Sequence, residues 1–214
     1  MSCEIYTIGH SILTSEKFVE LLKRHAITAI ADVRSAPYSR HNPQFNQEEL
    51  RSTLKAVGIK YVFLGKELGA RSADECCYVD DKVQYDLLAR IDLFQSGIRR
   101  VIEGASTHRI ALMCAERDPL DCHRTILVAR ELAKNGCAVW HILHSGALET
   151  HQDAICRLVE RLGFGEQDMF RSEMLSEEEA YTKQGNLIAY SRKVQLRIGL
   201  QEKFHAYMYE QDDQ

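Results

Sequence analysis

The chain has 214 residues, 45% of them hydrophobic, and a formal net charge of -4. This length is enough for one well-packed domain and short for two, so we expect a single core. The mildly acidic balance, without a block of Lys and Arg, makes general nucleic-acid binding a possibility that is not favoured. No apolar run approaches the roughly 18 residues that span a bilayer, and an acid stands where a signal peptide would be basic. We therefore expect no membrane association and a cytoplasmic protein.

Apolar segments with strand character recur along the first two thirds of the chain, at residues 5–9, 27–33, 59–64, 110–114 and 138–143. Helical patterning separates them, which is typical of a mostly parallel sheet. We predict a three-layer, doubly wound α/β fold with about five strands and an α/β domain over residues 1–165.

The helices are predicted from apolar spacing and capping residues. We expect helices over residues 15–25 with Thr14 or Ser15 as N-cap, from Asn46 as N-cap onward, over 83–103 with a break near Ser96-Gly97, from Pro119 to Ala133, and over 150–162. Beyond Gly163 the apolar density falls, and Ser176 opens a further helix that ends near Tyr190. Residues 166–214 are therefore predicted to be a helical extension packed on the same domain, with 211–214 disordered.

Seven cysteines are scattered along the chain, at positions 3, 76, 77, 114, 122, 137 and 156. We interpret all of them as thiols, because their number is odd and a chain of this size does not need disulfide bonds for stability. Cys137 and Cys156 lie within apolar patterns, so we expect both to be small buried residues.

Polar side chains follow each predicted strand, and ligands of open parallel sheets bind outside the carboxyl ends of the strands. The first strand ends in Gly9-His10-Ser11, and the second leads into Asp32-Val-Arg34. Several such ends together predict a cleft at this edge of the sheet.

The segment from Cys114 to Arg124 is the most informative part of the sequence. An apolar strand delivers Cys114, and a helix that begins at Pro119 is predicted to carry Cys122, His123 and Arg124. A helix N-terminus and nearby cations lower the pKa of a cysteine, so this pattern is typical of reactive thiols. Two alternatives stay open: both cysteines are structural, or Cys114, Cys122 and His123 bind a metal ion. We assign no metal ligands, because the spacing is not Cys-x-x-Cys and adjacent residues rarely bind one ion.

The loop Asp32-Val-Arg-Ser-Ala-Pro-Tyr-Ser-Arg40 carries two guanidinium groups, which suit phosphate and carboxylate ligands. Arg71 and Arg124 could complete an anion site. Alternatively, Arg34 forms a structural ion pair with Asp32 or Glu116. Neither the G-x-G-x-x-G nor the P-loop pattern occurs, which argues against those nucleotide sites. Cys114 also does not begin the Cys-x5-Arg loop of thiol phosphatases, because position 120, where that loop has Arg, is Leu.

Several separated motifs, in this order, are similar to those of a known family. They are Thr7-Ile-Gly-His-Ser11, Asp32 to Arg40 followed by Pro43 and Phe45, Gly58-Ile-Lys-Tyr61, Leu68-Gly69, and Cys114-Ala-Glu with Cys122-His-Arg124. Together they resemble the domain of unknown function 488 family over about residues 4–146, and residues 180–190 resemble the closing helix of its longer members. Ala70 and Cys76-Cys77 depart from the family pattern in one loop. The resemblance implies a three-layer α/β fold and a polar cleft at these motifs, and it supplies no established reaction.

The residues favour an enzyme that acts on a small anionic, phosphorylated or nucleotide-like substrate. The candidate substrate-binding residues are His10, Ser11, Arg34, Ser39, Arg40, Arg71 and Arg124. The candidate catalytic residues are Cys114 or Cys122 as nucleophile and Asp32, Glu116 or His123 for proton transfer. We expect the anion near the helix that begins at Pro119, contacted by Arg34 or Arg124 and by backbone amides of residues 116–122. No cofactor is identified.

Two other functions remain possible on the same residues. A noncatalytic anion or nucleic-acid binding module would use the same arginines and would need exposed aromatic side chains, for which Tyr38 and Phe45 are the candidates in the arginine loop. A Cys/His metal-binding protein would be recognised by elemental analysis.

Overall fold

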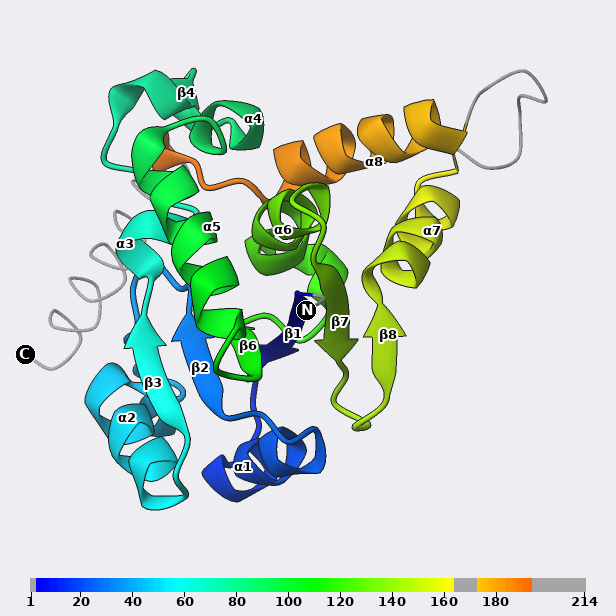
Figure 1. The fold of residues 1–214 in the computed structure, drawn as a ribbon. Coiled ribbons are helices and arrows are strands. Elements are labelled where there is room, and N and C mark those ends of the chain that lie inside the picture. Colours follow the sequence, from blue (N-terminus) through cyan, green and yellow to red (C-terminus); the bar gives the residue numbers. More distant parts are fainter. Residues whose placement is uncertain (1–2, 164–172, 194–214) are drawn as a thin grey trace, which may run out of the picture.

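A computed structural model of the protein describes residues 3–163 and 173–193, and within them a sheet of six strands forms the centre of the fold (Figure 1). The strand order is β3-β2-β6-β1-β7-β8. The bounds are β1 Glu4–Gly9, β2 Ala29–Asp32, β3 Lys60–Phe63, β6 Ile110–Cys114, β7 Ala138–Ile142 and β8 Leu148–Thr150. The first five are parallel, which confirms the predicted strands and the mostly parallel sheet. The short β8, which pairs antiparallel with β7, was not predicted.

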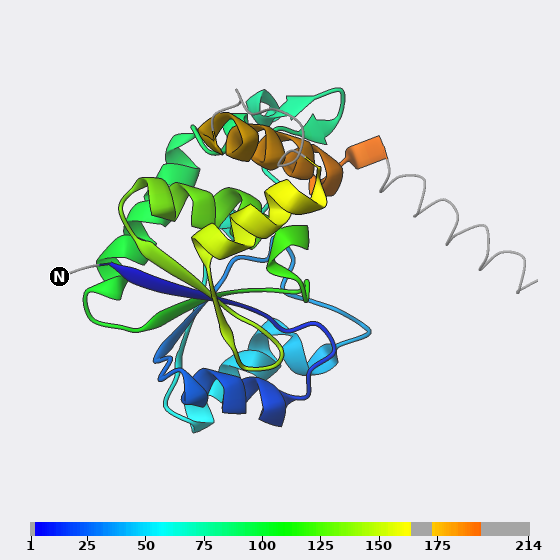
Figure 2. The same ribbon diagram turned by 90° about the vertical axis from the view of Figure 1, so that its right-hand side faces the viewer.

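Helices cover both faces of the sheet and make three layers, as Figure 2 shows edge-on. One face carries α1 Ser15–Arg24 and α2 Gln47–Ala56, and the other carries α5 Asp92–Ala105, α6 Arg130–Lys134 and α7 His151–Arg161. A hydrophobic core lies on each face of the sheet, and alternate residues of β1 and β6 pack into one or the other. Ile5 and Leu112 face α5 and α6, whereas Ile8 and Met113 face α1 and α2. This is the period of two that a strand buried on both sides imposes. The three-layer α/β prediction is confirmed.

The helical region over residues 83–103 breaks at a different place from the one predicted. It consists of α4 Tyr85–Leu88 and α5, so the break precedes Asp92 and does not fall at Ser96-Gly97. Gly97 instead lets α5 pack closely against α3 Gly65–Leu68, because a Cβ at Gly97 would lie 2.8 Å from Leu68 Cδ2. A small hairpin, β4 Tyr78–Val79 and β5 Lys82–Val83, follows a 3₁₀ turn at Glu75–Cys77 and joins α3 to α4.

Thr14 caps α1, as predicted, by accepting a hydrogen bond from the backbone N–H of Lys17 at 3.2 Å. Asn46 is the N-cap residue of α2, as predicted, but its side chain makes no capping bond to the helix. Its Oδ1 atom accepts from the backbone N–H of Ser39 at 2.7 Å instead. Asn46 therefore ties down the arginine loop rather than the helix.

The single helix predicted from Pro119 to Ala133 is replaced by three shorter pieces. A 3₁₀ turn covers Pro119–Asp121, a π-helix covers Arg124–Ala129, and α6 follows. Cys122 lies between the first two with extended backbone angles, φ -135° and ψ 138°. Pro119 fits the first position of a 3₁₀ turn as well as that of an α-helix, so the sequence pattern did not distinguish them.

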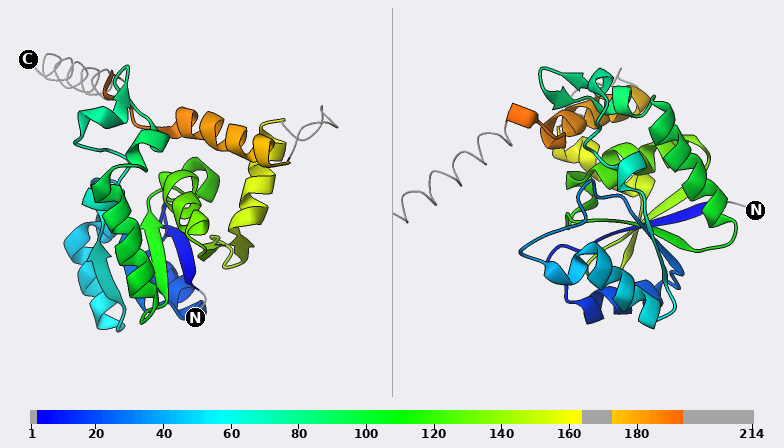
Figure 3. Two further views of the ribbon diagram at one scale, coloured as in Figure 1. Left: turned by 45° about the horizontal axis from the view of Figure 1, so that its top comes forward. Right: turned by 90° about the vertical axis from the view of Figure 1, so that its left-hand side faces the viewer.

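The C-terminal helix α8 spans Glu173–Ile188 and crosses the top of the domain above α6 and α7, as Figure 3 shows. It begins before Ser176, which was expected to open it. Tyr181 packs into the hydrophobic core that lies between the sheet and α5, α6 and α7. Gln184 Nε2 donates to the Leu120 carbonyl at 2.9 Å. The described part of the extension thus contacts the α/β core, and the boundary at residue 165 stays a prediction. Residues 211–214, predicted to be disordered, lie outside the described residues.

Two predictions about cysteines are wrong. Cys3 and Cys137 form a disulfide, and Cys156 is exposed. The bond follows from the pairing of β1 with β7, since the Cys3 carbonyl accepts from the backbone N–H of Ala138 at 2.8 Å. The two residues are 134 positions apart, so their approach could not be seen before the sheet order was known.

The disulfide predicts a thiol count. Alkylation of the denatured, unreduced chain should modify five cysteines, because those are the free ones, and alkylation after reduction should modify all seven. Mass spectrometry measures both numbers, and peptide mapping should place the two missing adducts on Cys3 and Cys137. Seven adducts without reductant would contradict the bond.

Among the described residues, none of the helices is long and apolar enough to cross a membrane. The cytoplasmic location expected from the sequence stays a prediction.

Candidate functional site

A cavity of about 320 Å³ opens beyond the carboxyl ends of β2 and β6. The loop after β2 contributes Arg34, and the end of β6 and its following loop contribute Cys114 and Glu116. Arg71, from the segment after α3, and Tyr190, just after α8, also line it. The pocket thus lies where ligands of doubly wound folds bind.

Arg34 and Asp32 form a buried ion pair below this pocket. The guanidinium donates from Nε and Nη2 to the two carboxylate oxygens at 3.0 and 2.7 Å, and Nη2 also donates to the Phe45 carbonyl at 2.8 Å. Tyr61 Oη donates to the same carboxylate at 2.7 Å. Asp32 is fully buried and Arg34 is 6% exposed. The structural ion pair that the sequence left open is therefore present, and it occupies most of the donors of Arg34.

His10 completes this network. Its Nε2 lies 3.3 Å from Arg34 Nη1, its Nδ1 lies 3.0 Å from the Ser11 carbonyl, and its ring stacks on Phe45. Burial is the main reason that the pKa of His10 falls to about 4. A neutral ring with the proton on Nδ1 satisfies both contacts, since Nε2 then accepts from Arg34. His10 holds Arg34 in place and does not line the pocket.

Arg124 is also buried, with 1% of its surface exposed. Its guanidinium donates to the carbonyls of Glu116 and Arg117 at 2.8 and 3.3 Å. It therefore fixes the loop after β6, and its Nε atom has no partner among the described residues.

The remaining predicted binding residues divide between the pocket and the surface. Arg71 lines the pocket, and its guanidinium carbon lies 4.7 Å from the centre of the Tyr190 ring. Ser39 Oγ accepts from two amides of its own loop, and Arg40 is exposed on that loop. Ser11, at the end of β1, and Arg40 do not line the pocket. The structure thus brings only part of the predicted set together.

The amides of the turn before Cys122 are bonded within the turn. Leu120 N donates to Asp118 Oδ1 at 2.9 Å, and Cys122 N donates to the Pro119 carbonyl at 3.3 Å. The helix N-terminus expected there is a three-residue 3₁₀ turn. Anion contact with the amides of residues 116–122 stays a prediction.

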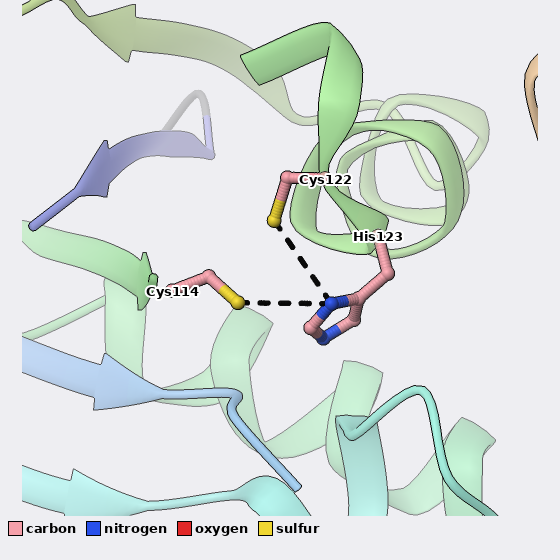
Figure 4. Close-up of side chains that lie close together, drawn as sticks. All are labelled: Cys114, Cys122 and His123. Atoms are coloured by element: carbon pink, nitrogen blue, oxygen red, sulfur yellow. Dashed lines mark hydrogen bonds between the residues drawn. The ribbon is translucent and has the colours of Figure 1, made fainter. Parts of the chain in front are cut away.

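Two thiols, an imidazole and a carboxylate meet at the floor of the pocket. Figure 4 shows the side chains of Cys114, Cys122 and His123 pointing toward one another. His123 Nδ1 lies 3.7 Å from the Cys114 sulfur and 3.9 Å from the Cys122 sulfur. The Cys122 sulfur lies 2.9 Å from Glu116 Oε2. The extended backbone at Cys122 is what turns two adjacent side chains to the same centre.

The pKa values of the two thiols in this cluster are shifted in opposite directions. Burial raises the pKa of Cys114, and the neighbouring Cys122 raises it further. Burial also opposes ionisation of Cys122, but the hydrogen bond from Cys114 and the charge of Arg124 outweigh it and hold the pKa well below the usual value. Burial would lower the pKa of His123, but its contact with Cys122 raises it. The cluster thus favours ionisation of Cys122 over that of Cys114.

Glu116 extends the cluster toward solvent. Much of its side chain is exposed, yet desolvation of the carboxyl group and the nearby Cys122 sulfur both raise its pKa. Since Cys114, Glu116 and His123 line the pocket and Cys122 does not, a bound molecule meets the first three.

Some site residues were missed by sequence reasoning. Tyr61 was noted only as a motif residue, although it binds Asp32, and Tyr85 was not considered, although it lines the pocket. Tyr190 and Ile188 reach the pocket from the far end of the chain. The similarity of residues 180–190 to a closing helix was the one available signal for them. Phe45 is fully buried, so of the two candidate aromatics for nucleic-acid stacking only Tyr38 is exposed.

Comparison with known proteins identifies a family. The family model described as domain of unknown function DUF488 matches residues 14–130. The match includes the arginine loop and the Cys114–Arg124 segment but not Thr7-Ile-Gly-His-Ser11 or the C-terminal helix. Neither a curated protein nor a solved structure matches the chain.

Proposed function

Since the chain belongs to the family described as domain of unknown function DUF488, which names no reaction, we propose a function from the pocket itself. We infer that the protein is an enzyme acting on a small molecule that bears an anionic group, such as a phosphorylated or nucleotide-like compound. Arg71 binds the anionic group, and the wall formed by Cys114, Glu116 and His123 carries the reaction.

The observation that carries this proposal is that one available guanidinium, that of Arg71, lines the same pocket as Cys114, Glu116 and His123. Arg34 and Arg124 are engaged with protein acceptors, whereas Arg71 has no carboxylate within ion-pair distance among the described residues. Stacking on Tyr190 orients the planar guanidinium group of Arg71, whose paired N–H donors suit phosphate or carboxylate. A cavity of about 320 Å³ is of the size that small-molecule sites have.

The geometry also distinguishes the expected proton-transfer residues. Asp32 is fully buried and bonded to Arg34 and Tyr61, so it supports the site from below. Glu116 lies at the pocket surface and is the better placed carboxylate. The nucleic-acid alternative has less support, because Phe45 is buried and Arg40 lies away from the pocket.

Replacement of Arg71 tests the proposal. Inorganic phosphate should raise the melting temperature of the wild-type chain, and Arg71→Ala should weaken phosphate binding by about 1.5–3 kcal/mol, the range for hydrogen bonds to charged groups. Thermal melts over a phosphate series, with chloride at matched ionic strength, give the apparent affinities.

The matched control is Arg40→Ala, which removes an exposed arginine outside the pocket. Its phosphate response should equal that of the wild type. Equal responses of Arg71→Ala and the wild type, or a loss confined to Arg40→Ala, would contradict the assignment of the anion to this pocket.

A further inference from the structure

The three buried groups at the pocket floor are spaced like ligands of one metal ion. Cys114 Sγ, Cys122 Sγ and His123 Nδ1 all lie within 4.8 Å of one another. A tetrahedral zinc centre with its usual bond lengths separates a sulfur ligand from a nitrogen ligand by roughly 3.6 Å. The two sulfur-to-nitrogen distances here are 3.7 and 3.9 Å, close to that value.

His123 is held in the orientation that a ligand requires. Its Nε2 lies 3.0 Å from the Val33 carbonyl, which can only accept, so this nitrogen carries the proton. Nδ1 is then the nitrogen left to face the two sulfurs. Metal-binding histidines are oriented in the same way, through a carbonyl or carboxylate on the other nitrogen. The backbone N–H of Arg124 also points at the Cys122 sulfur, at 3.4 Å.

The charges of the cluster suit a divalent cation. Two thiolates and the Glu116 carboxylate, set against the Arg124 guanidinium, leave a net charge of about -2 when no proton is bound. Because the two sulfurs are buried, their share of this charge needs compensation, either by protons or by a cation. An ion of charge +2 would neutralise it and release the protons that the cluster otherwise holds.

We propose that Cys114, Cys122 and His123 bind one divalent ion of the zinc class, with its fourth coordination position open to the pocket beside Glu116. Two thiolates and one imidazole are the donors that such ions prefer. Three protein ligands with an open position are typical of catalytic rather than structural zinc sites. This inference deepens the proposed function, on which its catalytic reading rests, but ion binding is measurable without any substrate.

The test uses the full chain, reduced at its free thiols, stripped with a chelator and offered one equivalent of Co²⁺ or Zn²⁺. We expect about one ion per chain and, with Co²⁺, the charge-transfer absorption of thiolate ligands in tetrahedral geometry. Cys122→Ala and His123→Ala should each bind at least ~100-fold more weakly, since even changes beyond the direct ligands cost 10–100-fold. A wild-type chain that binds no ion, or a Co²⁺ spectrum without thiolate absorption, would overturn the proposal.

Two matched controls decide between this site and other thiols. Cys76→Ala removes one member of the adjacent Cys76-Cys77 pair, whose sulfurs are 4.0 Å apart, and Cys156→Ala removes an exposed thiol. Both should keep the full Co²⁺ spectrum, and its loss in either one would overturn the assignment. If a ligand variant fails to fold, the wild-type spectrum with these controls still decides.

The Arg71→Ala variant separates the two proposals. It should keep the ion and lose the phosphate response. An ion without a wild-type phosphate response would end the proposed function alone, and a phosphate response without an ion would end the metal inference alone.

Discussion

Arg34→Ala should lower the free energy of unfolding by about 3–5 kcal/mol, the cost of removing one partner of a buried ion pair. The variant leaves the Asp32 carboxylate fully buried with only the Tyr61 hydroxyl and the Arg34 backbone N–H as donors. It also removes the donor to the Phe45 carbonyl and the partner of His10. Urea denaturation at neutral pH measures the loss.

Arg51→Ala is the matched control, because Arg51 pairs with Glu48 on the surface of α2 at 3.3 Å. Its cost should stay below about 1 kcal/mol. Asp32→Ala combined with Arg34→Ala should cost less than the sum of the single changes, since neither charge is then left alone. An Arg34→Ala protein of wild-type stability without a phosphate response would show instead that Arg34 is a ligand-binding residue.

Gly9→Ala should destabilise the protein by about 3 kcal/mol or more, at or above the upper end of the usual cost of overpacking. A Cβ at Gly9 would lie 1.8 Å from the Glu116 carbonyl oxygen and 3.1 Å from Arg124 Nη1. The first contact is with backbone, so no side-chain rotation relieves it. β1 lies between β6 and β7 and cannot shift, so the loop that carries Glu116 must move.

This displacement should also disturb the pocket, and we expect the Gly9→Ala protein to lose most of its Co²⁺ absorption and phosphate response. Gly104→Ala is the control, since a Cβ there would meet only the flexible end of Ile110, at 3.0 Å, and alanine favours the helix. Its stability should stay within about 1 kcal/mol of the wild type. A Gly9→Ala chain with unchanged stability and an intact spectrum would show that the close approach of β1 does not shape the site.

The fold was largely predictable because its strands are apolar runs between helical segments. A fully buried strand such as Ile110–Cys114 is recognisable because all of its residues are apolar. The short β8 and the Cys3–Cys137 bond were missed, since both depend on which strands become neighbours.

The location of the candidate site in the fold was predictable, but the contacts among its residues were not. Strand ends identified where Asp32, Cys114 and Glu116 would gather. The partners of Arg34 depend on the path of a loop, so the sequence allowed both an ion pair and an anion site. The convergence of Cys122 and His123 depends on one extended residue after a 3₁₀ turn, and local patterning predicts a continuous helix there.

We propose that the pocket beyond β2 and β6 binds a ligand by its anionic group. A crystal structure of the wild-type chain, grown without other multivalent anions and soaked in inorganic phosphate, tests it most directly. We predict density for phosphate with an oxygen about 2.7–3.2 Å from the Arg71 guanidinium and with its open side toward Glu116 and Cys114. Phosphate bound only elsewhere on the surface, with solvent alone in the pocket at saturating concentration, would show that the pocket does not bind the anionic group.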